Sequence, residues 1–559
     1  MKTSDTGDLW WKTAVVYCLD VQTFMDWNGD GNGDFVGLTE RVDYLNDLGV
    51  TCLWLMPFYP TTDRDDGYDI TDFYGVDPRL GSHGDFVEFV RTARDRGMRV
   101  IVDLVVNHTS DKHPWFRAAR SSKDSPFRDF YVWTPDPPDH TASQVVFPDQ
   151  EDSIWELDDK TGEYYLHQFY KHQPDLNVAN PKVRDEIVKA MGFWLELGIS
   201  GFRVDAVPFL LGLTGIPDSA VEEFSDPHQY LAALRSFVGR RTGDGILLGE
   251  VNLPYEEQTR FFGGADGDEL TMQFDFVGMQ SFFLSLARQD AGALVRTLRS
   301  RPAVSPDSQW ATFLRNHDEL TLDKLTDEER QEVFAAFGPE PGMQLFGRGL
   351  RRRLPPMLDG DPRRIRMAYS LMFSLPGTPV LFYGEEIGMG ENLDVDGRLA
   401  VRTPMQWSPQ PNGGFSSARA SKLPRPVVGG AYGPEHVNVA AQRSDPDSLL
   451  SFVTLLIRRY RESPELGWSE VQILEQPYAH VLAHLCARDD RRLVLLHNFA
   501  ADRCTVPLRI DGCDSAFRLV DLLQDGVTAL DDSGSADLTI DGYGYRWLRL
   551  MSHESRRLA

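Results

Sequence analysis

The feature that most constrains the fold of this chain is a series of short apolar runs, most of them separated by amphipathic stretches. The runs are AVVYCLDVQTF (14–24), VTCLWLMPF (50–58), MRVIVDLVVNH (98–108), GISGFRVDAV (198–207), GILLGEVN (245–252), LTMQFDFVG (270–278), ATFLRNHDE (311–319) and TPVLFYGEE (378–386). Between them, stretches such as LTERVDYLNDLG place apolar residues at helical spacing. Near-continuous apolar strands that alternate with helices are typical of a parallel sheet covered on both faces. The sequence therefore predicts an α/β fold, a (β/α)₈ TIM barrel.

Two segments depart from this alternation and predict further domains. Residues 109–174 are rich in proline, aspartate and aromatic residues and lack helical periodicity, which predicts a small inserted domain after the third strand. Residues 467–552 contain short alternating runs with turn residues between them, which predicts a C-terminal antiparallel β-sandwich. The catalytic barrel would then comprise residues 10–108 and 175–466, with a charged insertion at 319–365 near its mouth.

Composition excludes several classes of partner. The formal net charge of -27 over 559 residues repels nucleic acid and anionic membrane surfaces. No apolar run approaches the roughly 20 residues of a membrane span. The five cysteines lack metal-binding spacing, and no nucleotide-binding glycine loop occurs in a suitable setting. We therefore expect a soluble cytoplasmic protein without an organic cofactor; its oligomeric state is open, and a homodimer is compatible with the sequence.

Three carboxylic residues, Asp205, Glu250 and Asp318, lie at the ends of three different strand-like runs. In a TIM barrel the carboxyl ends of the strands form one mouth, where the chemistry occurs. Retaining glycosyl transfer requires two carboxyl groups about 5–5.5 Å apart, one as nucleophile and one as proton donor. The three residues therefore indicate glycosyl chemistry, although each of them alone is compatible with a structural ion pair.

Arg203 precedes Asp205 by two residues on the same strand, so both side chains point to the same face. A guanidinium beside a carboxylate lowers the pKa of that carboxylate and fixes its orientation. The pair predicts an ionised Asp205.

Several motifs resemble a known enzyme family. DLVVNH (103–108), GFRVDAV (201–207), LLGEVN (247–252) and FLRNHDE (313–319) resemble the four signature regions of the α-amylase superfamily, glycoside hydrolase family thirteen, and QPDLN (173–177) resembles an additional motif. The resemblance covers nearly the whole chain. It implies Asp205 as nucleophile, Glu250 as general acid/base and Asp318 as transition-state stabiliser. It also implies that Arg203, His108 and His317 bind the sugar in the first subsite, with Tyr68 stacking on its ring.

Within this superfamily, stretches such as HPWFRAARSS, VRTPMQWS and VNVAAQRSDPDSLL resemble the trehalose synthase branch, whose members interconvert maltose and trehalose by intramolecular glucosyl transfer. Asp65 and Arg402 match a pair that closes the pocket over the non-reducing end in exo-acting relatives. The resemblance therefore implies a small α-glucoside substrate such as maltose or trehalose, and it disfavours internal cleavage of starch.

Two stretches differ from the pattern of that branch, namely PFLLGLTGIPDS (208–219) and VNLPYEEQTRFFGG (251–264). They fall on loops expected to enclose the leaving glucose. An exo-acting α-glucosidase or a transglucosidase on α-linked disaccharides therefore stays an alternative. A catalytically inactive sugar-binding barrel is disfavoured, because all three carboxylic residues are present.

The segment DWNGDGNGDF predicts a metal site, because it places oxygen-bearing residues at alternating positions: Asp26, Asn28, Asp30, Asn32 and Asp34. Such ligands suit structural Ca²⁺ or, less readily, Mg²⁺; the alternative is an Asx-rich turn without metal. The family resemblance implies that Asn32 contributes its backbone carbonyl. It also implies a second calcium site at Asn107 and Asp175, from which a third ligand is lost near Gly212.

Overall fold

The computed structural model describes residues 9–137, 144–210, 212, 227–264 and 266–553. The eight predicted runs form a closed parallel barrel in the order β1-β2-β3-β7-β8-β9-β10-β14. Its strands are β1 (Val16–Leu19), β2 (Cys52–Leu55), β3 (Arg99–Leu104), β7 (Gly201–Val204), β8 (Ile246–Gly249), β9 (Met272–Phe274), β10 (Gln309–Phe313) and β14 (Thr378–Phe382). Every strand residue except Arg99 is buried, as a sheet covered on both faces requires. The barrel closes where Val16 pairs with both Val380 and Cys52.

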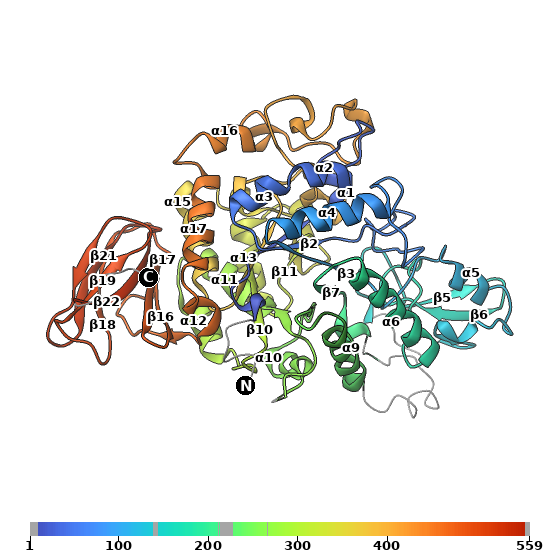
Figure 1. Cartoon of the computed structure of the whole chain (residues 1–559), viewed down its shortest axis with the longest axis horizontal. Helices are drawn as coiled ribbons and strands as arrows, with labels where there is room; N and C mark the ends of the chain where they lie inside the picture. Colours follow the sequence, from blue (N-terminus) through green and yellow to red (C-terminus); the bar gives the residue numbers. More distant parts are fainter. Residues whose placement is uncertain (1–8, 138–143, 211, 213–226, 265, 554–559) are drawn as a thin grey trace.

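Helices surround the barrel (Figure 1). They include α3 (Val42–Leu48), α4 (His83–Asp95), α6 (Pro181–Glu196), α9 (Pro227–Thr242), α11 (Phe276–Arg288), α12 (Gly292–Ser300), α15 (Pro362–Ser374) and α17 (Leu449–Arg461). Their first residues follow strong start signals in the sequence. Ser82 and Asp85 form a capping box at the start of α4, and Asn180 caps α6 just before Pro181.

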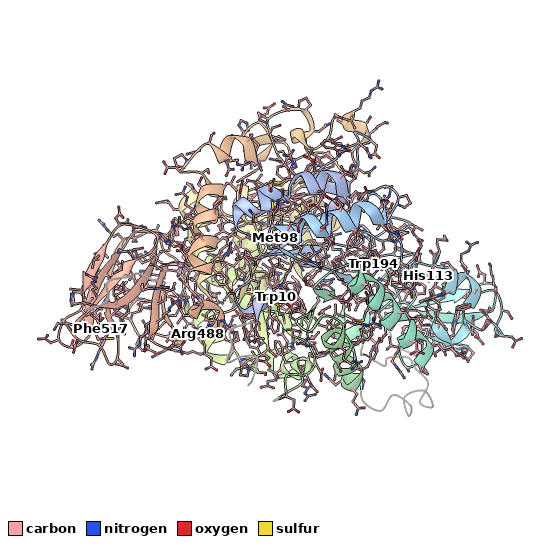
Figure 2. The ribbon with its side chains drawn as sticks, in the orientation of Figure 1. Trp10, Met98, His113, Trp194, Arg488 and Phe517 are labelled. Carbon is pink, nitrogen blue, oxygen red and sulfur yellow. The ribbon has the colours of Figure 1, made fainter. Side chains whose placement is uncertain are left out.

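The segment 109–174 contains the short helix α5 (Pro114–Ala119) and an antiparallel sheet of β4 (Trp133–Thr134), β6 (Glu163–Leu166) and β5 (Trp155–Asp158). It lies at the opposite end of the molecule from the C-terminal domain, as the positions of His113 and Phe517 show (Figure 2). Residues 144–147 and 167–170 run from this sheet back toward the barrel mouth, where Phe147 and Phe169 line the cavities described below.

The C-terminal domain consists of two antiparallel sheets. The larger contains β15 (Gln472–Ile473), β16 (Val481–Arg488), β17 (Arg491–Asn498), β22 (Tyr545–Ser552), β19 (Phe517–Asp521) and β20 (Val527–Ala529), and the smaller contains β18 (Cys504–Arg509) and β21 (Ser535–Ile540). Val494 and Leu548 of the larger sheet share one apolar cluster with Val506 and Leu538 of the smaller sheet. The domain is therefore the predicted sandwich.

The charged insertion 319–365 contains α13 (Asp327–Phe337), α14 (Leu354–Met357) and a small sheet of β11 (Leu320–Thr321), β13 (Gly349–Leu350) and β12 (Gln344–Leu345). Strands β12 and β13 are joined by the three residues 346–348, of which Phe346 and Gly347 have φ angles of 56° and 65° that suit a tight hairpin turn. The Phe346 ring contacts Phe147 with 4.9 Å between centroids. The insertion thus reaches the inserted domain across the barrel mouth.

No helix in the described part of the chain is long and apolar enough to cross a membrane. All five cysteines are free thiols, three of them buried.

Candidate active site

The predicted nucleophile and the predicted acid follow adjacent barrel strands. Asp205 comes directly after β7 and Glu250 directly after β8. The backbone N–H of Asp205 donates to Leu104 O (3.2 Å), and that of Glu250 donates to Val204 O (3.0 Å). These bonds extend the barrel ladder by one residue, so both side chains emerge at the carboxyl-end mouth, as the sequence predicts.

One buried guanidinium joins these two carboxyl groups. Arg203 Nη1 lies 2.5 Å from Asp205 Oδ1, and its Nη2 lies 2.8 Å from Glu250 Oε2. Nη1 also lies 2.5 Å from Oδ1 of Asp103, a residue of β3. Because a single planar group contacts both Asp205 and Glu250, the two carboxyls are close neighbours. A nucleophile and a proton donor that act on the same glycosidic bond require such close placement.

The pKa values of the two carboxyl groups differ in the direction that the two roles require. Burial raises the pKa of Asp205 to about 6, against the opposing charge of Arg203. Burial likewise raises the pKa of Glu250 to about 7, again opposed by Arg203. Near neutral pH, the two environments therefore favour an ionised Asp205 beside a protonated Glu250. A carboxylate nucleophile beside a carboxylic acid is the pairing that glycosyl transfer needs.

Asp318 is held by cations on one side and by an imidazole on the other. Its Oδ1 lies 2.9 Å from Arg402 Nη2 and 2.5 Å from Arg398 Nη1, and its Oδ2 lies 3.2 Å from His317 Nε2. Burial alone would raise the pKa of Asp318, but His317, Arg398 and Arg402 outweigh that effect and hold it well below its usual range. Asp318 is therefore a permanent anion, suited to stabilise a cationic transition state.

The aromatic and imidazole side chains predicted for the first subsite are buried neighbours. Tyr68 Oη lies 2.7 Å from His317 Nε2, and the two rings are parallel within 11°. His108 Nε2 lies 3.2 Å from Tyr68 O. Burial lowers the pKa of His108 to about 4, so this imidazole is a neutral hydrogen-bonding group. Burial also lowers the pKa of His317, against the opposing charge of Asp318.

A small cavity of about 60 Å³ lies between these side chains. It is lined by Asp65, Tyr68, His108, Phe147, Phe169, Asp205, Ala206, Glu250, Asp318 and Arg398. The structure thus brings six of the predicted site residues to one cavity. The three others (Arg203, His317 and Arg402) lie behind it and contact its carboxylates.

The predicted pairing of Asp65 with Arg402 needs correction. Asp65 Oδ1 instead lies 2.8 Å from Arg398 Nη2, whereas Arg402 Nη1 contacts the neighbouring Asp66 at 2.7 Å. The physical reason is that Arg398 lies within a short 3₁₀ turn (Gly397–Val401), and Arg402, just after it, is buried beneath Asp318 and donates to His317 O at 2.7 Å. Arg398, not Arg402, therefore forms the wall of the pocket next to Asp65.

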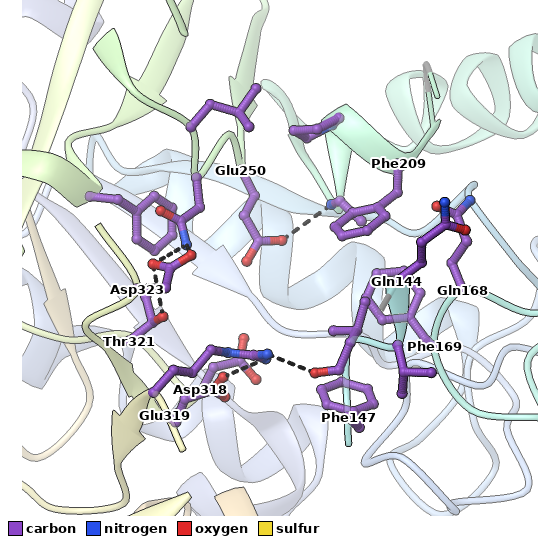
Figure 3. Close-up of a pocket in the computed structure, with 18 of the residues that line it drawn as sticks. Gln144, Phe147, Gln168, Phe169, Phe209, Glu250, Asp318, Glu319, Thr321 and Asp323 are labelled. Carbon is purple, nitrogen blue, oxygen red and sulfur yellow. Dashed lines mark hydrogen bonds and ion pairs between the residues drawn. The ribbon is translucent and has the colours of Figure 1, made fainter. Parts of the chain in front are cut away.

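A second cavity of about 590 Å³ adjoins the first on the side of Glu250 (Figure 3). Its lining includes Phe209 and Gly212, which belong to one of the two stretches that depart from the family pattern. Asn252 and Leu253 of the other stretch also line it. Residues 213–219 lie outside the described residues. The described parts of both stretches therefore border the space next to the proton donor, as expected for the side of the leaving group.

Sequence reasoning missed Asp103, Arg398 and the aromatic residues Phe147, Phe169 and Phe209. Asp103 is fully buried, and it also accepts from Trp54 Nε1 at 2.8 Å. The sequence signal for Asp103 is that it is the first residue of the motif DLVVNH. In the structure, the register of β3 and β7 pairs Asp103 with Arg203. Phe209 lies in the short helix α7 (Val207–Leu210), within a stretch that the sequence places near the leaving glucose, whereas no sequence signal points to Phe147 and Phe169.

The residue after the nucleophile has an unusual backbone conformation. Ala206 has a φ of 49°, in the left-handed region, and its N–H donates to Glu250 Oε2 at 3.1 Å. Such conformations in non-glycine residues cost about 1–3 kcal/mol and concentrate at functional sites. Here the strained residue orients the acid relative to the nucleophile.

The predicted metal loop is organised by Asx turns. Asp26 accepts from the N–H groups of Gly29 (2.7 Å) and Gly31 (2.9 Å), and Asp34 caps the helix α2 (Phe35–Glu40) by accepting from Gly37 N. Asn28 accepts from Asp30 N at 2.8 Å, and Asp30 in turn accepts from Asn32 N at 2.8 Å. In the described part of the chain, no three His, Cys, Asp or Glu side chains gather as a metal site. The predicted calcium site therefore stays a prediction.

The second predicted calcium site brings two residues together. Asn107 Nδ2 lies 3.4 Å from Asp175 Oδ1, and Asp175 also accepts from Gln168 N and Nε2. Burial raises the pKa of Asp175 to about 7. Asn107 and Asp175 thus lie within hydrogen-bonding reach of each other. The second calcium site stays a prediction.

Comparisons with known proteins agree with this geometry. The family described as "Alpha amylase, catalytic domain" matches residues 20–336 and 352–468, and "Sucrose hydrolase-like, C-terminal domain" matches residues 491–549. A protein named trehalose synthase from a Pimelobacter species is 40% identical over 97% of this chain and 96% of its own length. The trehalose synthase/amylase of Mycobacterium tuberculosis is 40% identical over 98% and 91%. Among solved structures, the trehalulose synthase of Pseudomonas mesoacidophila matches with a TM-score of 0.77 at 28% identity, over 97% of this chain and 99% of that one.

Proposed function

From the premise that this chain belongs to the α-amylase family of glycoside hydrolases, we propose that it interconverts maltose and trehalose by retaining glucosyl transfer. The observation that carries the chemistry is the single Arg203 guanidinium that contacts both Asp205 and Glu250. The choice of substrate is supported by 40% identity to proteins named trehalose synthase over nearly the full chain.

The first half-reaction breaks the glycosidic bond. A carboxylate oxygen of Asp205 attacks the anomeric carbon of the glucosyl unit, and Glu250 gives its proton to the departing glucose oxygen. Asp318 stabilises the positive charge that develops on the sugar ring. The products of this step are a β-glucosyl ester on Asp205, a carboxylate on Glu250 and a free glucose in the larger cavity.

The second half-reaction reverses these roles. The glucose turns within the cavity and presents its anomeric hydroxyl, Glu250 removes the proton of that hydroxyl, and the oxygen attacks the anomeric carbon of the glucosyl unit. The bond to Asp205 breaks, and α,α-trehalose forms with net retention. Starting from trehalose, the same steps return maltose. Attack by water in place of glucose would give hydrolysis, which is the activity of the alternative α-glucosidase.

The two cavities lie on the two sides of the expected cleavage point, next to Glu250. The cavity of about 60 Å³ ends at the Asp65–Arg398 pair, so the glucosyl unit has no room for a further sugar beyond it. The cavity of about 590 Å³ on the other side of the cleavage point leaves room for a glucose to reorient. The test is to incubate the enzyme separately with maltose and with trehalose and to quantify all sugars by chromatography. Each disaccharide should yield the other with little glucose; glucose as the main product would support the α-glucosidase instead.

We also propose that the loop 26–34 binds a structural Ca²⁺. Support comes from its alternating carboxylate and amide side chains, and from Gly29 and Gly31, whose φ angles of 76° and 113° allow the loop to turn tightly. The ion would stabilise the loop after β1 and has no step in the reaction. For cellular location we propose the cytoplasm, because free thiols such as Cys504 and Cys513 persist in a reducing compartment.

A further inference from the structure

The larger cavity has two chemically different sides (Figure 3). Phe147, Phe169 and Phe209 gather on one side, and Asp323 and Thr321 lie on the other, with Glu250 between them. A glucose ring has an apolar C–H face and a rim of hydroxyl groups. Aromatic rings suit the face, so the polar side is where hydroxyl groups would be bound.

The polar side is built around the carboxylate of Asp323. Its Oδ1 accepts from Asn252 Nδ2 (3.0 Å), Gln280 Nε2 (3.1 Å) and Thr321 Oγ1 (3.2 Å). Its Oδ2 accepts from Lys324 Nζ (2.9 Å). A carboxylate offers about four acceptor positions, so Asp323 has little capacity left for a sugar. Its role is to fix the groups around it.

Lys324 is the cation of this cluster with donors to spare, whereas Asn252 Oδ1 is a buried acceptor without a hydrogen-bond partner. An ammonium group has three donors, and the Asp323 contact uses one of them. The side chain lines the cavity and is 22% exposed, and its backbone N–H is anchored by Gln280 Oε1 on α11 (2.7 Å). Two donors therefore remain for hydroxyl groups in the cavity.

The reaction requires the polar side of the cavity to bind glucose in two orientations. The departing glucose leaves through one hydroxyl and attacks through another when it returns. A flexible lysine with rotatable donors can follow a turning ligand, whereas a planar guanidinium or a fixed amide can follow it less well. The observed cluster combines such a lysine with a rigidly held carboxylate.

On the basis of the proposed function, we propose that Lys324, positioned by Asp323, binds the departing glucose and retains it between the two half-reactions. The ammonium group determines how often the glucosyl-enzyme is captured by glucose instead of water. Lys324 does not touch the glucosyl unit on Asp205, so it is a specificity-determining residue and leaves bond cleavage to the carboxylates.

The test uses 4-nitrophenyl α-glucoside as donor, because nitrophenol is a good leaving group and departs without hydrogen bonds from the polar side of the cavity. The full-length enzyme is assayed for nitrophenol release and for disaccharide formation over a range of added glucose concentrations. In Lys324→Met, the glucose concentration that half-saturates transfer should rise about tenfold, the value of one hydrogen bond to a charged group. Nitrophenol release without glucose should fall clearly less than transfer to glucose does. Asp323→Asn should show a smaller rise, and Lys182→Met on the exposed surface of α6 serves as the matched control.

An unchanged half-saturating concentration in Lys324→Met would overturn the inference, even if the wild type interconverts maltose and trehalose. An equal loss of nitrophenol release and of transfer would also overturn it, because it would place Lys324 in the cleavage step. A wild type that transfers nothing to glucose overturns both this inference and the proposed function. Thermal unfolding of each variant separates these outcomes from a folding defect.

Discussion

Arg203 Nη2 lies 2.8 Å from Glu250 Oε2, so the residue predicted to orient the nucleophile also holds the acid. The same guanidinium contacts Asp205 and Asp103 and is 1% exposed. A buried cation that contacts three carboxyl groups offsets the free-energy cost of burying their negative charge away from water. It also links the protonation of Glu250 to that of Asp205, because a proton on either one changes the charge that the other faces.

Replacement of the nucleophile should abolish turnover. Asp205→Asn keeps a hydrogen-bond acceptor for Arg203 but cannot form the glucosyl ester, so kcat should fall by at least about 10⁴-fold. Rates are measured with 4-nitrophenyl α-glucoside, and a melting temperature close to that of the wild type shows that the fold is intact. Retained activity would refute the assignment of Asp205.

Loss of the acid should depend on the leaving group. Glu250→Gln cannot donate a proton, so turnover of maltose should fall by about 10²–10⁴-fold. Cleavage of 4-nitrophenyl α-glucoside, whose leaving group needs no proton, should fall much less when it is followed as the burst of the first turnover. An equal loss for both substrates would contradict the role of Glu250 as acid.

The pKa values predict a narrow pH optimum. Activity requires Asp205 ionised and Glu250 protonated, so kcat/KM should rise as the pH passes the pKa of Asp205, about 6. It should fall as the pH passes the pKa of Glu250, about 7. The pH profile of kcat/KM for trehalose should therefore be bell-shaped, with its maximum between these values. In Glu250→Gln, the descending limb should disappear; its persistence would assign that limb to another group.

The sequence predicted the barrel and the catalytic carboxylic residues for a physical reason. Barrel strands are apolar on both faces, and chemistry lies at their carboxyl ends, so Asp205, Glu250 and Asp318 stand out in the sequence against buried surroundings. The sequence does not show which charged side chains on the loops pair with one another. Asp65 and Asp66 are adjacent, and Arg398 and Arg402 are four residues apart, so only the structure shows which guanidinium faces which carboxylate.

The Asp65–Arg398 wall should restrict the enzyme to disaccharides. Behind this wall lies a further cavity of about 410 Å³, and both residues line it as well as the small reaction cavity. Arg398→Ala should lower overall activity, because Arg398 also contacts Asp318, but it should raise kcat/KM for maltotriose relative to maltose by about tenfold. Initial rates on the two sugars test this ratio, with Arg419→Ala on the exposed surface as control. An unchanged ratio would show that another group blocks the pocket.

Removal of calcium should destabilise the fold. An ion that binds only the folded state adds about 2.7 kcal/mol at one hundred times its Kd, so treatment with a chelator should lower the melting temperature. Added Ca²⁺ should restore it more effectively than Mg²⁺. Asp30→Asn, which removes an exposed carboxylate from the loop, should weaken this response. A melting temperature that is insensitive to chelation in the wild type would show that residues 26–34 form an Asx-rich turn without metal.

The most direct test of retaining transfer at Asp205 and Glu250 is proton NMR of the first products formed from maltose that carries ¹³C at C1 of its non-reducing glucosyl unit, which distinguishes that unit from the reducing-end glucose. Double displacement predicts that the anomeric signal of α,α-trehalose appears first, that any glucose released from the glucosyl unit by water appears as the α-anomer, and that Asp205→Asn gives neither. Early appearance of β-glucose from that glucosyl unit would show inversion and would contradict the assignment of Asp205 as nucleophile.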